Sequence, residues 1–412
     1  MCVPNWTGRL ALALMLLCLP SAAAANERMT AAEAVDRALT GESWPREWQA
    51  RVELAQADRV LARARPNPSL VASRETLAEP GLASGDETSL MLVQGFELGG
   101  RRAAGIRAAE AGLQVAEVQA IRDRRQLRAE TLRAYYATVA SEQIAAARAR
   151  ALADLEHLAG IAQKRHAEGE ISGYEARRFR QAAGQARIAL AETEAETRMR
   201  RAALVAWVGP TAALAVLDDS IPLPSLTEDH RPGSAELDVL AAEQTQAEAQ
   251  LQSVSRLPLP LTVGVGQRRV RLGGFSDAAL VLEVAVDLPL FDRQQGERAR
   301  ARAALSLAEA RREREQQQLQ QGRTALMAQA RTRIDSAERI ATVLLPEAAQ
   351  LSAIAKQSFS EGELDLVALL DAFDSESALV EQGVAERLAA VEAALALEAL
   401  APLVEPLPRV QH

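Results

Sequence analysis

The chain has 412 residues, and its 47 lysines and arginines against 55 aspartates and glutamates give a formal net charge of −8 at pH 7. This balance argues against duplex nucleic acid as a partner, because phosphate binding requires a basic face. Aromatic residues make up only 3% of the chain while alanine is abundant, and small side chains at helical spacing favour long, closely packed helices.

The first 25 residues have the pattern of a secretory signal peptide. The apolar run Leu10–Leu19 is too short to span a membrane, and the small residues Ser21–Ala25 offer cleavage sites. Both cysteines, Cys2 and Cys18, lie inside this segment, so the mature chain is expected to contain no disulfide. Whether Cys18 carries a lipid stays open. No later stretch is long and uncharged enough for a transmembrane helix, so we predict an exported chain without one.

The rest of the chain has the pattern of an internal duplication, in which each repeat contains two strands followed by two long helices. Residues 26–208 form the first unit, 209–233 a linker, 234–402 the second unit and 403–412 a tail. The elements predicted in the first unit are strands 69–77 and 87–98 and helices 100–166 and 174–208. Those predicted in the second are helix 234–256, strands 261–270 and 278–290, and helices 294–358 and 364–402.

The longest helix of the second unit has the period of a coiled coil. Small and apolar residues recur in steps of four and three: Ala330, Ile334, Ala337, Ala341, Leu344, Ala348, Leu351 and Ala355. Pro346 lies inside this run and is expected to kink the helix without ending it. Helix 294–358 would be about 95 Å long, which is more than a globular domain normally needs.

The strands alternate as membrane β-strands do. In 278–290 one face carries only Leu280, Leu282, Val284, Val286 and Leu288, whereas the other carries Glu283 and Asp287, which suit a wet interior. Four strands cannot close a barrel, and open edges are not tolerated in hydrocarbon. Three copies would supply twelve strands, and a cyclic trimer is the simplest closure.

Several motifs of the chain resemble those of the TolC-type outer-membrane efflux channels in their sequence, order and spacing. The resemblance is strongest to the outer-membrane members of heavy-metal RND efflux systems. The segments that carry the resemblance are Met29–Val35, Arg65–Pro68, Gln94–Arg102, Asp287–Arg293 and Gly362–Ala372. The resemblance covers nearly the whole mature chain.

The resemblance implies a fold and a set of partners. The fold would be mainly α-helical: a homotrimer whose twelve-stranded β-barrel lies in outer-membrane lipid and continues as a helical barrel through the periplasm. The partners would be a periplasmic membrane-fusion adaptor and an inner-membrane RND pump. Gly169 and Gly362 each interrupt a helical pattern and are expected to cap helices. The resemblance makes these turns, with Glu170 and Glu363, the tips that contact the adaptor.

The resemblance also suggests a pore constriction. Family members narrow the pore with two aspartates three residues apart, and the matching positions here are Ala368 and Asp371. Asp365 and Asp374 are further candidates for an acidic ring, which would favour cations, although a short acidic cluster is usually a solvated helix face. Helix phase allows Asp371 and Asp374 to share a face. A family tyrosine and arginine at this tip are replaced by Phe359 and Leu364, so the closing contacts should differ.

No residues suggest catalysis, a cofactor or a bound metal. No nucleophile motif or phosphate-binding loop stands out. The four histidines do not have the spacing of metal ligands: His157, His166, His230 and His412. We therefore predict a passive exit duct, not an enzyme, with heavy-metal cations as the expected cargo. Organic drugs or a secreted protein are alternative cargoes. A soluble periplasmic coiled-coil adaptor or scaffold is the alternative from a different class.

Overall fold

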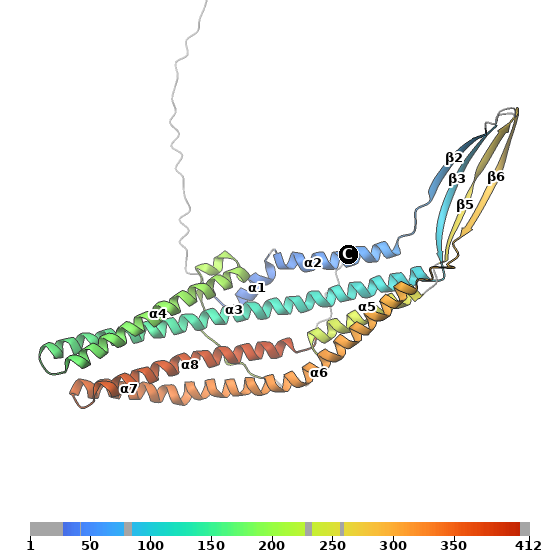
Figure 1. Ribbon diagram of the computed structural model, residues 1–412. Helices are drawn as coiled ribbons and strands as arrows, with labels where there is room; N and C mark the ends of the chain where they lie inside the picture. Colours follow the sequence, from blue (N-terminus) through green and yellow to red (C-terminus); the bar gives the residue numbers. More distant parts are fainter. Residues whose placement is uncertain (1–27, 42, 78–84, 227–232, 256–258, 404–412) are drawn as a thin grey trace, which may run out of the picture.

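The computed structural model describes residues 28–41, 43–77, 85–226, 233–255 and 259–403. The expected signal segment, part of the linker and nearly all of the tail lie outside these ranges. The described chain is long and thin, with a small β-sheet at one end and helices that run away from it (Figure 1). The prediction of a mainly helical chain with a small β part is confirmed.

The first half of the chain contains a helix, a β-hairpin and two long helices. Near the N-terminus, a two-residue strand and a short helix come first. The elements are β1 (Arg28–Met29), α1 (Ala31–Thr40), α2 (Ser43–Arg63), β2 (Ser69–Leu77), β3 (Gly85–Leu98), α3 (Arg101–Ala167) and α4 (Gly173–Val208). α3 has 67 residues and is therefore about 100 Å long. It runs from the sheet to the far end of the molecule, where α4 turns back along it (Figure 1).

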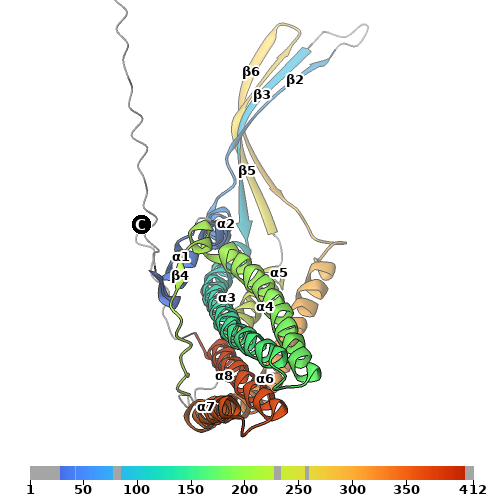
Figure 2. The same cartoon turned by 90° about the vertical axis from the view of Figure 1, so that its left-hand side faces the viewer.

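The second half repeats this order after a short connecting segment. The connecting elements are a 3-10 turn (Pro210–Ala213) and β4 (Val216–Leu217). The elements that follow are α5 (Ala235–Ser255), β5 (Leu259–Leu272), β6 (Phe275–Val286), α6 (Gln295–Arg339), a π turn (Ile340–Leu344), α7 (Leu345–Glu361) and α8 (Leu366–Ala399). α7 and α8 form a second helical tip beside that of α3 and α4 (Figure 2).

The strand ends differ from those expected. β3 begins at Gly85, which pairs with both Leu77 and Leu272, and β5 is longer than predicted at both ends. β6 ends at Val286, so Asp287 and Leu288 lie outside the sheet, and this part of the prediction was wrong. Pro289 lacks the N–H that a continued ladder would need, and the Leu290 N–H bonds back to the Leu288 carbonyl at 2.8 Å.

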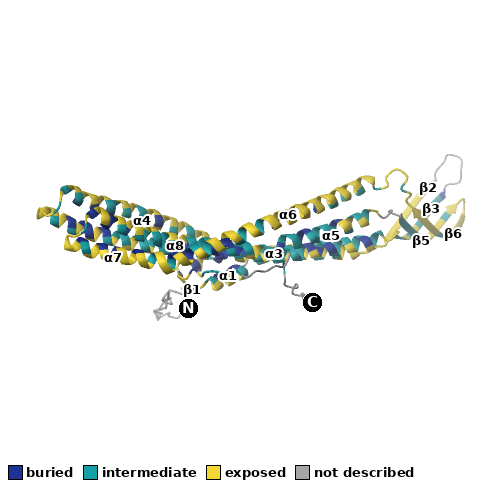
Figure 3. Cartoon of the chain, turned by 90° about the horizontal axis from the view of Figure 1, so that it is seen from below, coloured by how far each residue is buried: buried dark blue, intermediate teal, exposed yellow. Residues whose placement is uncertain are grey.

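The sheet is antiparallel in the order β2-β3-β5-β6. Residues paired across the strands lie on one face, so the register defines rows across the sheet. One row contains Leu70, Leu92, Val265 and Leu282, and the next towards the hairpin turns contains Ala72, Leu90, Gln267 and Leu280. The apolar residues of β6 therefore continue into an apolar face over all four strands, and this face is largely exposed (Figure 3).

The expected kink in the second long helix occurs as a π turn directly before Pro346. Proline has no N–H to bond the carbonyl four residues earlier, and a π turn absorbs this loss by inserting one residue. The insertion also shifts the coiled-coil register. Ala348 and Ala355 are buried as predicted, but Ser352 replaces Leu351 on the buried side, and Leu351 is 63% exposed.

A compact core lies at mid-length, where β1, β4 and α1 pack against α3 and α4 (Figure 3). Its centre is Tyr135 of α3, which is 1% exposed. The Tyr135 hydroxyl donates to the Met29 carbonyl at 2.7 Å and accepts from the Asp218 N–H at 2.9 Å. One side chain thereby joins the start of the described chain to the segment that follows α4.

Because Tyr135 is buried, its pKa is raised from 10.0 to about 12, mainly through desolvation of the phenolate. The folded state retains this proton more tightly than the unfolded state, so the contribution to stability is complete below pH 10 and is lost as the pH rises towards 12. We expect the melting temperature of the purified protein to fall over this range. The Y135F variant should be less stable at neutral pH and should lack this part of the pH dependence.

Within the residues that the structure describes, no helix is both long and apolar enough to cross a membrane.

Candidate functional site

The two helical tips are built in the same way. At each tip a glycine adopts positive φ, +82° at Gly169 and +81° at Gly362. The following residue donates back into the preceding helix: the Glu170 N–H to the Arg165 carbonyl and the Glu363 N–H to the Ser358 carbonyl, both at 2.9 Å. These are Schellman caps, which satisfy the last carbonyls of a helix.

The N-cap of the helix that follows each tip lies three residues after the glycine. At the first tip Ser172 accepts from the Glu175 N–H at 3.2 Å, and the Glu175 carboxylate accepts from the Ser172 N–H at 2.8 Å. At the second tip the Asp365 carboxylate accepts from the Ala368 N–H at 2.8 Å. Asp365 therefore serves as an N-cap. Glu170 and Glu363 are exposed beside the glycines.

Replacing Gly362 with alanine is expected to destabilise the second tip by about 1–2 kcal/mol, because only glycine adopts positive φ without steric cost. The matched control is Gly184, which lies within α4 and has no atom within 4 Å of an added Cβ. G184A should be neutral or slightly stabilising. Amide hydrogen exchange of residues 355–370 tests this prediction. We expect faster exchange in G362A than in G184A. Equal exchange in the two variants would mean that alanine at position 362 causes no backbone strain.

Arg165 and two aromatic rings join the tips. Arg165 donates to the carbonyls of Phe359 at 3.4 Å and Ser360 at 3.0 Å, which are in the last turn of α7. Its guanidinium also lies 5.5 Å from the centre of the Phe359 ring. Phe359 packs edge-on against Phe179 of α4 at 5.6 Å, and Leu364 packs against the same core. The two positions that depart from the family pattern therefore make apolar contacts.

Lys356 forms a second link between the helix pairs. Its ammonium lies 2.8 Å from a carboxylate oxygen of Asp154 in α3 and 4.6 Å from the centre of the Phe373 ring in α8. Both charged side chains are nearly half exposed, so the ion pair itself contributes little to stability. The pair nevertheless shows that this part of α7 lies beside α3.

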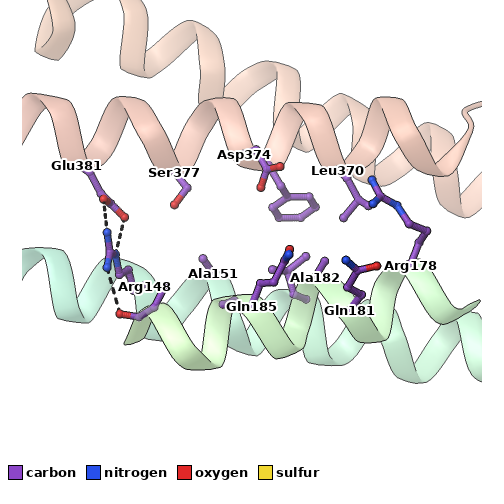
Figure 4. Close-up of a pocket in the computed structure, with 14 residues that line it drawn as sticks. Arg148, Ala151, Arg178, Gln181, Ala182, Gln185, Leu370, Asp374, Ser377 and Glu381 are labelled. Carbon is purple, nitrogen blue, oxygen red and sulfur yellow. Dashed lines mark hydrogen bonds and ion pairs between the residues drawn. The ribbon is translucent and has the colours of Figure 1, made fainter. Parts of the chain in front are cut away.

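The strongest polar link lies further from the tips and is shown in Figure 4. Arg148 of α3 forms a bidentate ion pair with Glu381 of α8, and both N–O distances are 2.7 Å. The same guanidinium donates to the Thr193 hydroxyl at 2.6 Å and the Ala189 carbonyl at 3.1 Å, both in α4. The hydrogen bonds that Arg148 donates to Glu381 raise the pKa of Arg148. One side chain thus ties three helices together.

The three candidate constriction acids do not lie together. Asp374 lines a cavity of about 310 Å³ between α8 and the α3–α4 pair, which also contains Arg148 and Arg178 (Figure 4). Asp371 lines a different cavity, of about 350 Å³, between α7 and α8, together with Ala368. Asp371 and Asp374 thus line different cavities, on the two sides of α8 that pack against α7 and against the α3–α4 pair.

The two candidate acids of the sheet also differ in position. Glu283 lies in β6 and pairs with Gly264 of β5. Because side chains alternate along a strand, Glu283 lies on the other face of the sheet from Leu280, Leu282 and Val284. Asp287 lies beyond the last paired residue of β6, as described above. Both are exposed.

Sequence reasoning missed the links that join the two helix pairs. Arg148 and Glu381 are 233 residues apart, and Lys356 and Asp154 are 202 apart. Neither pair has a local spacing signal, because each depends on how separate helices pack. Arginine and glutamate are common in all of these helices, so no single residue stood out. Among the described residues, no group of three or more histidine, cysteine or acidic side chains could hold a metal ion.

Comparisons with known proteins give consistent results. Residues 45–210 match the family model for outer membrane efflux proteins. The chain is 28% identical over 322 residues to the cobalt-zinc-cadmium resistance protein CzcC of Cupriavidus metallidurans, which covers 76% of this chain and 75% of that protein.

Solved structures share the fold. The outer membrane protein VceC of Vibrio cholerae superposes with a TM-score of 0.74 at 19% identity, covering 91% of this chain and 97% of VceC. CusC superposes with a TM-score of 0.73 at 14% identity, and the match covers 89% of this chain and 91% of CusC. The CusC structures concern conformational changes that accompany folding and transmembrane channel formation. The predicted resemblance is confirmed, and it is to channel proteins of efflux systems, not to enzymes.

Proposed function

We propose that this chain, which is similar to the TolC-type outer membrane efflux proteins, is the outer-membrane exit duct of a three-part efflux system. Three copies would close one barrel in the outer membrane and continue it as a helical duct through the periplasm. Substrate would pass through passively, because energy would be supplied by an inner-membrane RND pump that connects through a periplasmic adaptor.

The observation that carries this proposal is the apolar face of the sheet. Leu280 and Leu282 are 82% and 71% exposed, and the register extends the apolar surface across all four strands. Exposed apolar area of this kind marks a contact with lipid or protein. The opposite face includes Glu283 and the glycines Gly264 and Gly266, which suits a water-filled interior.

The sheet edges support assembly from several copies. Among the described strands, nothing pairs with the outer edge of β2 or of β6. In hydrocarbon such edges would leave N–H and C=O groups unsatisfied. Pairing β6 of one copy with β2 of the next removes both edges, and three copies give twelve strands. The exposed Leu351, Ile354 and Val367 at the second tip are then available for contacts between copies.

Heavy-metal cations are our proposed cargo. The similarity to CzcC, a cobalt-zinc-cadmium resistance protein, supports this choice, as do acidic side chains along the proposed lumen. Asp371 is the leading candidate for a threefold acidic ring, with Asp374 and Asp365 as weaker ones given their positions. Glu283 would lie in the barrel lumen. Gly169, Glu170, Gly362 and Glu363 would contact the adaptor.

Fractionation of cells that express the full chain tests the proposed function. The duct requires protein in the outer membrane that only detergent extracts, that migrates as a trimer and that conducts ions in planar bilayers. A soluble periplasmic protein or a monomer would favour the coiled-coil scaffold. If a trimeric channel forms but its deletion changes sensitivity to organic toxins and not to metals, the duct would stand with a different cargo.

Reversing the charge at Asp371 tests the constriction. D371K replaces three negative charges with three positive ones in a trimer, so we expect cation preference in planar bilayers to fall several-fold. D374K is the matched control, because Asp374 lines the other groove. Unchanged selectivity in D371K would remove Asp371 from the pore, and an equal loss in D374K would show that the effect does not depend on the groove that Asp371 lines.

A further inference from the structure

Beyond its apolar rows, the sheet carries opposite charge on its two faces. Arg74 and Arg269 flank Thr88 in one row, on the same face as Leu280 and Leu282 by strand alternation. Arg271 lies in the next row beside Asp86. This face therefore has three arginines against one aspartate. At the same level the other face has three acids against one arginine: Glu75, Glu87, Asp277 and Arg268.

These three arginines, which we call the distal arginine band, are available to a partner. All three are exposed. Arg74 lies 3.7 Å from Asp86, a long and weak pairing. Among the described residues, Arg269 and Arg271 have no ion pair or side-chain hydrogen bond. By contrast, Arg268 on the opposite face lies 3.4 Å from Glu87.

The position of the distal arginine band relative to the membrane follows from the geometry of the strands. On this face the apolar residues of β3 extend from Leu98 to Leu90, interrupted by Gln94, which is about 27 Å of strand. Because barrel strands tilt by about 35–45°, this corresponds to roughly 20 Å along the membrane normal, slightly less than the roughly 25 Å that outer-membrane barrels present to lipid. Arg74 and Arg269 lie one row, about 7 Å of strand, beyond Leu90. Their long side chains would place guanidinium groups where hydrocarbon gives way to headgroups.

We propose that the distal arginine band binds phosphate groups of the lipid headgroups in the outer leaflet around the barrel. Guanidinium binds phosphate through two parallel hydrogen bonds, and neighbouring guanidiniums could hold the two phosphates of one glycolipid headgroup. A band of positive charge on an otherwise acidic chain, confined to the lipid side, fits this partner. The inference depends on the proposed function, since it requires the apolar face to meet lipid.

Native mass spectrometry of the detergent-solubilised full chain tests this proposal, with hexa-acylated diphosphoryl lipid A as the probe. We expect R269Q/R271Q to weaken binding by about tenfold or more, because charge-assisted hydrogen bonds are lost. R268Q, one residue away on the opposite face, should bind as the unaltered chain does. Lipid A with one phosphate should bind the unaltered chain more weakly.

Several results would overturn the proposal. Equal binding by R269Q/R271Q and the unaltered chain would do so, as would an equal loss in R268Q. If R269Q/R271Q fails to assemble, R269K/R271K is used instead, and it should lose several-fold because lysine cannot bind in two-pronged fashion. A chain that reaches the outer membrane as a trimer but binds no lipid A would contradict only this inference, whereas a soluble chain would contradict the proposed function as well.

Discussion

Replacing Arg148 with alanine is expected to raise the fraction of open channels about tenfold. Arg148 is the side chain that ties α8 to both α3 and α4, and its pair with Glu381 is largely buried, with each side chain less than 30% exposed. Hydrogen bonds to charged groups of this kind contribute about 1.5–3 kcal/mol. If opening requires the second tip to move away from the first, the closed state alone loses this energy, and each 1.4 kcal/mol is a tenfold change.

Single-channel recording in planar bilayers measures this effect. T193V is the matched control, because it removes one hydrogen bond to Arg148 and leaves the ion pair intact, so its effect should be much smaller. The exchanged pair R148E/E381R should restore part of the closed population. An R148A channel with unaltered open probability, or an exchanged pair no better than either single variant, would show that this link does not hold the duct closed.

Replacing Leu282 with arginine is expected to prevent assembly in the outer membrane. Leu282 lies in a middle row of the apolar face, and arginine at the middle of a membrane costs about 2–4 kcal/mol. A trimer carries this cost three times, which approaches the whole stability of an ordinary domain. The adjacent Glu283 provides the control, because it lies on the opposite face of the same strand and is exposed.

Quantitative fractionation with a heat-modifiability gel compares the two variants. L282R should accumulate outside the membrane or be degraded, whereas E283R should reach the outer membrane at close to normal levels. Equal recovery of both variants would mean that the apolar face does not meet lipid. Loss of both would indicate a folding defect unrelated to the face.

The elements that depend on local pattern could be predicted from sequence. Strand alternation around Leu282, the two tip glycines and the order of hairpins and helices all follow from nearby residues. The π turn before Pro346 could not, because a kink can be absorbed in several ways, and its one-residue insertion moved Leu351 out of the core. Likewise, Asp287 continued the alternation in sequence, but the ladder between β5 and β6 ends at the Leu261–Val286 pair, one residue before it.

The candidate site was harder to predict than the fold. The tips were identified from their glycines, but the contacts between them come from residues about 200 positions apart, such as Arg165 with Ser360. Helix phase alone put Asp371 and Asp374 on one face, whereas packing against two different neighbours places them in separate grooves. Distances of this kind depend on tertiary packing, which no local spacing encodes.

Chemical crosslinking between sheet edges tests the central claim that three copies close one barrel. Cysteine is introduced at Ser73 in β2 and, in turn, at Asp277, Ala279, Val281 and Glu283 in β6, and membranes are treated with a short bismaleimide. The parent chain is the control. If three copies close one barrel, at least one pairing should give dimers and trimers and no larger product. Absence of crosslinks in every pairing, or a ladder that continues beyond three chains, would contradict a closed barrel of twelve strands.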